Sequence, residues 1–289
     1  MRLTARDMAV VRAVYDYRAL TTEQIQRLYF GNAGQAARIA QRRLQALYHH
    51  RYVFRGDQPH RTLEAKPLVY FLDTVGVDLL CDRLGLERTE VDWHPRHNDV
   101  TSLYLDHLLA SNDLRIAVVQ AAEAHGFVIQ RWLDDRSLKR SHAGEHVTIT
   151  NKDGRRMTVS VVPDGYFRLT TPQDTYNFFV EIDKRTVTGL ASKWGRRDWS
   201  RKVAAYAEYH RSGGYEARYG TADMRVLTIT TGQRRLQNLK VITEETVSGA
   251  PVGRFWFTTL ERATADSILT GTIWAVGGAD NPYSIVGQL

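Results

Sequence analysis

The alternation of apolar and polar residues in the N-terminal part of the chain predicts helices and a hairpin. Met8, Val11 and Tyr15 recur at helical spacing after Thr4, which can cap the helix. The expected elements are a helix beginning at Thr4, a second beginning at Thr21 or Thr22, a turn at 31–34, a third helix over about 35–49, strands at 52–55 and 68–72, and a helix at 75–84. This order is that of a winged helix-turn-helix.

The third predicted helix has one apolar and one basic face. Its inward-facing residues are expected to be Ala37, Ala40, Leu44 and Leu47. The opposite face carries Arg38, Gln41, Arg42, Gln45 and His49. Arginine can hydrogen-bond guanine and glutamine can hydrogen-bond adenine in the major groove. The predicted wing adds cations for phosphates, namely Arg51, Arg55, His60, Arg61 and Lys66. The alternative is a solvated charged helix face, but the helix order, the turn and the basic hairpin together favour DNA binding.

The second half of the chain alternates helices and strands in an order that predicts a mixed α/β (α+β) sandwich. The expected elements are a long helix at about 101–125, strands at 127–133, 147–150, 157–162, 167–169 and 176–182, a helix at 201–211, a strand at 225–230, a helix at 233–245, and a strand at 254–258. The tail from residue 277 is expected to be irregular or weakly docked. A charged connector at 86–99 separates the two patterns. We therefore expect a winged helix-turn-helix domain at 1–90 and an α/β domain at 100–289.

Composition narrows the classes of partner. The 289 residues carry a formal charge of +7 and a pI near 9.5, which favours polyanions such as nucleic acid. The single cysteine, Cys81, excludes a disulfide framework within the chain and fits a reducing cytosol. No apolar run reaches the length of a membrane span and no signal peptide is visible, so the expected location is cytoplasmic and no membrane partner is expected.

Acidic residues follow two strand-like runs in the second half. Asp164 comes after the apolar run 159–162, and Glu181 comes after the run 176–180. Two adjacent strands would bring these carboxylates to one end of a sheet. Carboxylate oxygens suit a divalent metal, Mg²⁺ or Mn²⁺, which is the one cofactor that the sequence suggests. Such a site can support phosphodiester hydrolysis.

The spacing of this cluster departs from that of a working PD-(D/E)XK nuclease. Such an enzyme places a lysine two positions after the second acid, where this chain has Asp183. One interpretation is an active site of Asp164, Glu181 and Asp183 with a cation from elsewhere, first Lys202 and then Lys193. A second is weak metal or phosphate binding without chemistry. A third is a structural role, with the acids paired to Arg185, Arg196, Arg197 or Arg201.

The segment after the acids is basic and aromatic. Its residues are Lys184, Arg185, Lys193, Trp194, Arg196, Arg197, Trp199, Arg201 and Lys202. Cations mixed with rings suit a nucleic-acid groove, in which phosphates meet charges and bases meet rings. The alternative is a basic loop whose tryptophans belong to the core.

Three short motifs give the chain a resemblance to a known family. They are His107-Leu108-Leu109-Ala110-Ser111-Asn112-Asp113, then Pro163-Asp164 with the run from Phe179 to Thr186, and Lys202 with the helix from Tyr206 to His210. With the winged-helix region before them, they resemble the replication-relaxation family of bacterial plasmid and mobile-element proteins, over roughly residues 5 to 230. The resemblance implies a PD-(D/E)XK nuclease-like second domain, a role in plasmid replication or transfer, and importance for His107 and Asn112. The family tends to carry Glu-x-Asp where nucleases carry Glu-x-Lys.

We therefore expect a site-specific protein that binds double-stranded DNA and acts in replication, transfer or transcriptional control. A homodimer is expected, because winged-helix regulators commonly bind paired half-sites. The alternative is a metal-dependent endonuclease or nickase, and a further alternative is an adaptor that binds replication or transfer proteins.

Overall fold

The computed structural model describes residues 1–31, 34–56, 67–141, 145–150, 154–184 and 193–287, without the side chains of residues 141 and 193–198. The chain divides into two compact units, residues 1–116 and 117–289. The division falls inside the long helix α5 (Ser102–His125) and not in the connector at 86–99, which contains the short 3-10 helices η1 (Arg88–Glu90) and η2 (Pro95–Asn98). Each unit is described in turn.

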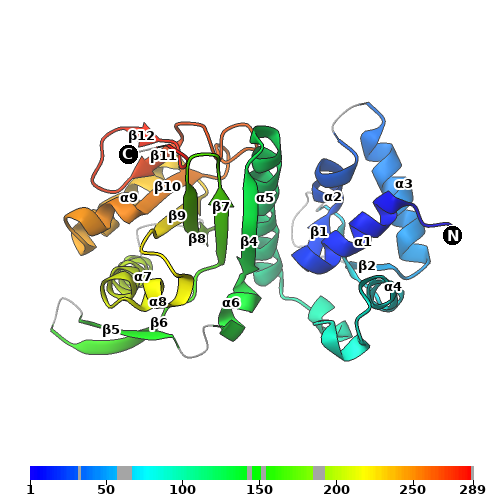
Figure 1. Ribbon diagram of the computed structural model, residues 1–289, viewed down its shortest axis with the longest axis horizontal. Coiled ribbons are helices and arrows are strands. Elements are labelled where there is room, and N and C mark those ends of the chain that lie inside the picture. Colours follow the sequence, from blue (N-terminus) through cyan, green and yellow to red (C-terminus); the bar gives the residue numbers. More distant parts are fainter. Residues whose placement is uncertain (32–33, 57–66, 142–144, 151–153, 185–192, 288–289) are drawn as a thin grey trace. The chain divides into compact units, whose positions relative to one another are not determined.

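The N-terminal unit contains the expected helices and hairpin in the expected order (Figure 1). Its elements are α1 (Ala5–Tyr17), β1 (Ala19–Thr21), α2 (Thr22–Tyr29), α3 (Ala36–His49), β2 (Val53–Gly56), β3 (Val69–Leu72) and α4 (Thr74–Leu84). The short strand β1, which the apolar pattern did not predict, pairs with β3 to complete an antiparallel sheet of order β1-β3-β2.

Local sequence signals set the starts of the first two helices. Thr4 caps α1 and Thr21 caps α2, each in a reciprocal capping box with the residue three positions later, Asp7 or Gln24. On α3 the buried stripe is Ala36, Ala40, Leu44 and Leu47. The expectation of Ala37 in this stripe was wrong, because Ala36 continues the four-residue spacing back from Leu44 and Ala37 lies on the exposed side.

The first part of α5 belongs to the N-terminal unit because its polar residues bind the backbone and side chains there. Asn112 donates from Nδ2 to the carbonyls of Tyr17 at 3.1 Å and Ala19 at 2.7 Å. Gln24 donates to the carbonyl of Leu109 at 2.9 Å. These contacts account for a unit boundary beyond the connector.

The C-terminal unit is a mixed sheet of order β12-β11-β10-β9-β8-β7-β4. The described elements after α5 are β4 (Val128–Asp134), α6 (Asp135–Ser141), β5 (His146–Thr150), β6 (Arg156–Ser160), β7 (Gly165–Thr170), β8 (Thr175–Asp183), α7 (Lys193–Arg211), α8 (Gly214–Tyr219), β9 (Arg225–Thr230), α9 (Gln233–Thr246), η3 (Ala250–Arg254), β10 (Phe255–Thr259), β11 (Trp274–Val276) and β12 (Pro282–Tyr283). Strands β8, β9 and β10 are parallel, and the other pairs are antiparallel. The predicted mixed α/β fold is confirmed.

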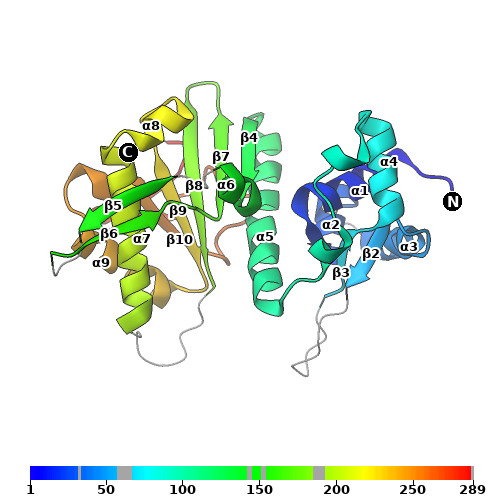
Figure 2. The same ribbon diagram turned by 90° about the horizontal axis from the view of Figure 1, so that it is seen from below.

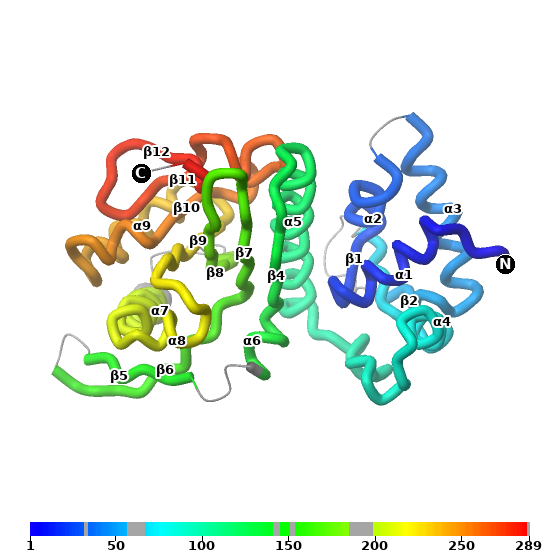
Figure 3. The backbone as a smooth tube through the Cα atoms, viewed as in Figure 1, coloured from blue at the N-terminus to red at the C-terminus, as the bar shows by residue number. Residues whose placement is uncertain are grey.

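Helices α7 and α9 pack on one face of this sheet. Val203 and Tyr206 of α7 and Leu239 of α9 belong to one buried cluster with Phe179 and Phe257 of the sheet. Burial of such aromatic and aliphatic side chains is the main stabilising contribution to this unit. Figure 3 shows the same arrangement as a backbone tube, with α9 running beside β10.

The β5–β6 hairpin forms a separate two-stranded sheet beside α7 (Figures 1 and 2). Its inner residues Val147 and Ile149 are buried in the cluster under α7, while Thr148 and Thr150 are exposed. The apolar run expected to precede Asp164 in the main sheet lies partly in this hairpin. Asp164 therefore stands just before β7 and not at the end of a strand of the main sheet.

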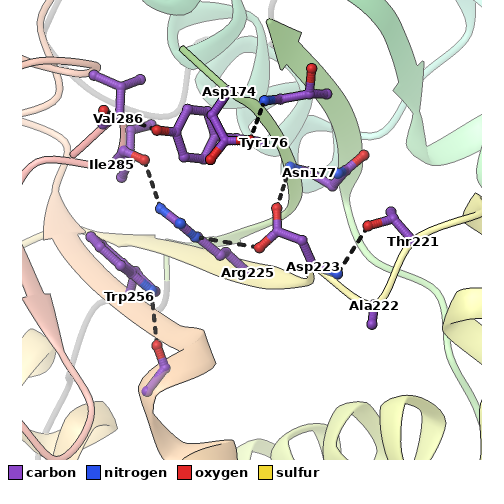
Figure 4. A network of polar contacts seen from close by, with 12 residues as sticks. Asp174, Tyr176, Asn177, Thr221, Ala222, Asp223, Arg225, Trp256, Ile285 and Val286 are labelled. Atoms are coloured by element: carbon purple, nitrogen blue, oxygen red, sulfur yellow. Dashed lines mark hydrogen bonds and ion pairs between the residues drawn. The ribbon is translucent and has the colours of Figure 1, made fainter. Parts of the chain in front are cut away.

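The C-terminal tail is docked more firmly than the sequence suggested. From residue 277 on it is mostly irregular, as expected, but it contributes the edge strand β12, and Arg225 binds the segment after that strand (Figure 4). The Arg225 guanidinium donates to the carbonyl of Ile285 at 2.7 Å and lies over the rings of Tyr176 and Trp256. The Tyr176 hydroxyl donates to the carbonyl of Val286 at 3.2 Å. The sequence gives no sign of this docking, because Arg225 of β9 and Tyr176 of β8 are distant from the tail along the chain.

Within the described part of the chain, every helix is too short or too polar to span a lipid bilayer.

Candidate functional site

The basic face predicted for α3 is exposed. Arg38, Gln41, Arg42, Gln45 and His49 are all solvent-exposed residues. Three of them, Arg38, Gln41 and Gln45, are spaced by three and four residues and therefore share one side of the helix. Helix α3 contains no aspartate or glutamate, so no acid of the helix itself offsets the positive charge of this side.

The cations predicted for the wing are only partly described. Arg55 on β2 is exposed and its guanidinium lies 5.0 Å from the centroid of the Tyr48 ring. Arg51, just before β2, donates to the Thr74 hydroxyl at 2.7 Å, which ties it to the start of α4. His60, Arg61 and Lys66 lie outside the described residues.

A buried ion pair holds α3 against α1. Asp7 is 1% exposed and accepts hydrogen bonds from Arg43 at both of its carboxylate oxygens, with Nε 3.0 Å from Oδ1. Burial by itself would raise the pKa of Asp7, but the bonds from Arg43 and Thr4 outweigh it and the pKa is lowered. Arg43 is thus structural, whereas Arg38 and Arg42 extend from the exposed side. The sequence carries no local signal for this pair, because its members are 36 positions apart.

The acidic residues Asp164 and Glu181 meet where β7 and β8 pair. Gly165 of β7 stands opposite Val180 of β8 in the antiparallel register. The Asp164 amide donates to the Val180 carbonyl at 3.0 Å, and the Ile182 amide donates to the Asp164 carboxylate at 2.9 Å. The predicted convergence of the two acids is therefore present, although the hairpin and not a strand end produces it.

Glu181 is a buried carboxylate with partners on α7. It is 3% exposed, and the Lys202 ammonium lies 2.5 Å from its Oε2. The Tyr206 hydroxyl, one helical turn further, donates to Oε1. Burial raises the pKa of Glu181 to about 7, Lys202 opposes this rise and Asp164 adds to it. Lys202, the first cation considered from the sequence, is thus placed against Glu181.

Asp183 has a different partner, which the sequence interpretation missed. Arg235 of α9 donates from Nε to its carboxylate at 2.6 Å, and each side chain is 13% exposed. Because 52 positions separate them, only the packing of α9 against the sheet brings them together. Arg235 lies in the first turn of α9, and no local feature of the sequence links it to Asp183.

The carboxylates therefore do not form the expected ligand set of three. Within the described residues, no group of three or more His, Cys, Asp or Glu side chains is placed to hold a metal ion. Asp183 is directed to Arg235, and the Glu181 oxygens contact Lys202 and Tyr206. A divalent metal at Glu181 would share the carboxylate oxygens with the Lys202 ammonium and the Tyr206 hydroxyl.

Two buried hydroxyls lie next to these acids in the sheet. Thr228 stands in register with Glu181, and Thr230 with Asp183, on the parallel strand β9. Both are fully buried, and their hydroxyls have no hydrogen-bond partner among the described residues. Buried polar groups are normally satisfied, so these hydroxyls mark a place where a water or ion would be stabilised.

The other basic and aromatic residues proposed for a nucleic-acid groove lie in the core, at the surface or outside the described residues. Trp199 is buried, and its indole donates to the Leu239 carbonyl at 3.2 Å and the Thr243 hydroxyl at 3.0 Å. It belongs to the core and not to an open groove. Arg201 and Lys184 are exposed. Arg185 and the side chains of Lys193, Trp194, Arg196 and Arg197 lie outside the described residues.

In the motif that begins at His107, Asn112 has a structural role. Asn112 is 5% exposed, and both of its described hydrogen bonds go to backbone carbonyls, one at the end of α1 and one at the start of β1. Asp113, the last residue of the motif, pairs with Arg27 of α2 at 3.0 Å. The motif therefore contributes the contacts that hold α5 to the N-terminal unit.

Comparison with solved structures finds weak likeness to a nuclease. Two structures of restriction endonuclease FokI, one of them bound to DNA, align at 12% and 13% identity over 89% and 91% of this chain. The alignments span 43% and 45% of the FokI chains, so this chain covers less than half of their length. A TM-score of 0.29 in both cases is too low to establish a shared fold. No curated protein matches the sequence.

The family comparison is more extensive. The sequence profile described as Replication-relaxation matches residues 11–224, which include α3, the α5 motif, both acidic residues of the hairpin and Lys202. The match covers most of the chain and confirms the resemblance inferred from the three motifs. The chain belongs to the Replication-relaxation family.

Proposed function

We propose that this chain is a cytoplasmic, site-specific protein of a plasmid or mobile element that binds double-stranded DNA and acts in replication, transfer or transcriptional control. Family membership supports a DNA-related role, and the exposed basic face of α3 is the observation that carries the finer proposal.

Helix α3 has the features of a recognition helix. It follows α2 in the order of a winged helix-turn-helix and precedes the β2–β3 hairpin, the proposed wing. The pair of Asp7 and Arg43 fixes its inner side, so the outer side is presented by a rigid element. Arg38 and Arg42 are proposed to contact guanine edges or phosphates, and Gln41 and Gln45 to contact adenine edges.

The arginines of the proposed wing and the net positive charge of the chain contribute the part of DNA binding that does not depend on base sequence. Arg51, Arg55 and Arg61 are proposed to contact phosphates, and the net charge of +7 favours association with a polyanion. Paired half-sites would be bound by a homodimer, with replication or transfer proteins as further partners. Light scattering of the protein with and without its duplex tests the dimer, and a strict one-to-one complex would refute it.

The test is a selection from a random duplex library, followed by fluorescence anisotropy on the selected duplex and on an unrelated one. Arg38→Ala and Arg42→Ala should each weaken specific binding by about 1–3 kcal/mol. Arg83→Ala removes an exposed arginine from α4 and serves as the matched control. Equal affinity of the Arg38 variant and the control for the selected duplex would reject the role of α3.

The second candidate function is a metal-dependent endonuclease or nickase. It is favoured by Lys202 at 2.5 Å from Glu181 beside Asp164, and by the buried hydroxyls of Thr228 and Thr230 in the same sheet, which have no hydrogen-bond partner among the described residues. It is opposed by the commitment of Asp183 to Arg235. In this alternative Lys202, and not a lysine on β8, supplies the cation of the site.

A nicking assay, in which supercoiled plasmid is incubated with excess protein and Mg²⁺ or Mn²⁺, distinguishes the nuclease from a protein that only binds DNA. Nicking that disappears in Asp164→Ala and Glu181→Ala but persists in Arg83→Ala would establish the enzyme. Plasmid that stays supercoiled, with protein shown to bind it, would leave DNA binding as the function and remove the nuclease.

A further inference from the structure

A cleft of about 800 Å³ lies in the C-terminal unit, away from the acidic site. It is bordered by the β5–β6 hairpin, by α7 and by the segment from Val247 to Arg254. Lys202 and Tyr206, which contact Glu181, are not among the residues that line it. The DNA-binding proposal for α3 gives this cleft no role.

Part of the cleft is lined by apolar residues, and α7 contributes two alanines next to its polar residues Glu208, His210 and Arg211. Ala204 and Ala207 of α7 line it and are three positions apart, so they lie on one side of the helix. Ile149, Val247 and Pro251 complete the apolar part. Alanine side chains allow another backbone to approach closely, and the space accommodates a few apolar side chains of a partner.

The rim of the cleft is positively charged. Arg156, Arg211 and Arg254 line it, against one glutamate, Glu208. Glu208 already accepts two hydrogen bonds from Arg211, at 2.7 and 2.6 Å. The charges left for a ligand are therefore those of Arg156, which is exposed, and Arg254, whose described hydrogen bond is a long one of 3.5 Å to the Ala250 carbonyl.

The chemistry of the lining discriminates between anionic ligands. Among the described residues that line the cleft there is no Phe, Tyr or Trp. Binding of single-stranded nucleic acid uses aromatic rings on which bases stack, so this lining does not suit it. A partly apolar lining with arginines at its rim suits a protein segment whose apolar side chains enter the cleft and whose carboxylates meet the arginines.

We propose that this cleft, defined by Ala204, Ala207, Arg156 and Arg254, is a docking site for an acidic amphipathic segment of a partner protein. The apolar side of the segment lies against α7 and its acidic residues pair with Arg156 and Arg254. The site gives the chain a protein-binding surface that is separate from the basic face of α3.

The test uses the full chain and a fluorescein-labelled helical peptide of about sixteen residues, with leucine at every third or fourth position and glutamate between. A peptide of the same composition in scrambled order is the first control, and a single-stranded oligonucleotide is the second. Fluorescence anisotropy should show binding of the amphipathic peptide that weakens with salt, with clearly weaker binding of the scrambled one.

Variants of the cleft separate docking from general charge attraction. Arg156→Glu with Arg254→Glu, and separately Ala207→Trp, should each weaken peptide binding at least about tenfold. Arg234→Glu on the exposed side of α9 and Ala217→Trp on α8 are the matched controls and should leave it unchanged. The proposal is overturned if the peptide does not bind, if Ala207→Trp binds it like the wild type, or if the oligonucleotide binds instead and is lost in the same variants.

Discussion

Replacing Lys202 with methionine tests the electrostatics of the acidic site. Methionine keeps the length and apolar stem of lysine, so the change removes mainly the charge beside Glu181. Burial raises the pKa of Glu181 from an ordinary 4.5 to about 7 even with Lys202 present. The folded chain therefore holds this proton more tightly than the unfolded chain does.

The sign and size of the effect follow from this shift. A carboxyl whose pKa is raised by folding contributes its full stability below its unfolded pKa and loses it as pH rises through the folded value. At about 1.4 kcal/mol per pKa unit, ionisation of Glu181 should lower the free energy of unfolding of the wild type by about 3 kcal/mol between pH 4 and pH 8. Removal of the Lys202 charge should lower the free energy of unfolding further, by about 1–2 kcal/mol at pH 8. This is less than the effect of removing a fully buried partner, because the Lys202 side chain is 46% exposed.

Thermal unfolding from pH 5 to pH 8 measures this. The Lys202→Met variant should unfold about 2–8 °C below the wild type at pH 8 and close to it at pH 5, where Glu181 is already protonated. Glu181→Gln should flatten the pH dependence and abolish the effect of Lys202→Met in the double variant. Arg201→Met, which removes the neighbouring charge, is the control. An equal loss at pH 5 and pH 8, or a loss that persists in the double variant, would refute the reasoning.

Two further predictions concern the rest of the fold. Asp7→Asn should destabilise the N-terminal unit by roughly 2–4 kcal/mol at pH 7 in urea unfolding. Because the pKa of Asp7 is lowered by folding, its contribution is present above the unfolded value and lost as pH falls through the folded one. The variant should therefore approach the wild type as the pH falls below the ordinary carboxyl pKa of 3.8; a constant difference would contradict this. Arg225→Ala should speed amide hydrogen exchange in the tail that follows β12, since it removes the bond to the Ile285 carbonyl, and exchange unchanged relative to Arg262→Ala would show that the tail is held by other contacts.

The spacing of apolar residues and the helix-capping threonines were sufficient to predict much of the secondary structure. The spacing of apolar residues located α1 and α3, and strand β9 was predicted with the bounds that the structure has, Arg225–Thr230. These predictions succeed because 3.6-residue and two-residue repeats, with threonine caps, are local properties. The start of α7 was predicted eight residues too late, because its basic first turns carry no apolar period of their own.

The sequence by itself determined the basic face of α3, most of the longer helices and strands, the family, and the approach of Asp164 to Glu181, since each depends on residues close together along the chain. Only the tertiary structure decided which cation each acid meets. Lys202 reaches Glu181 and Arg235 reaches Asp183 because α7 and α9 pack on the same face of the sheet. The same packing buries Glu181 and raises its pKa. The spacing of apolar residues within a helix or strand does not indicate such long-range contacts. The segment that separates two contacting residues can vary in length without any change in that spacing.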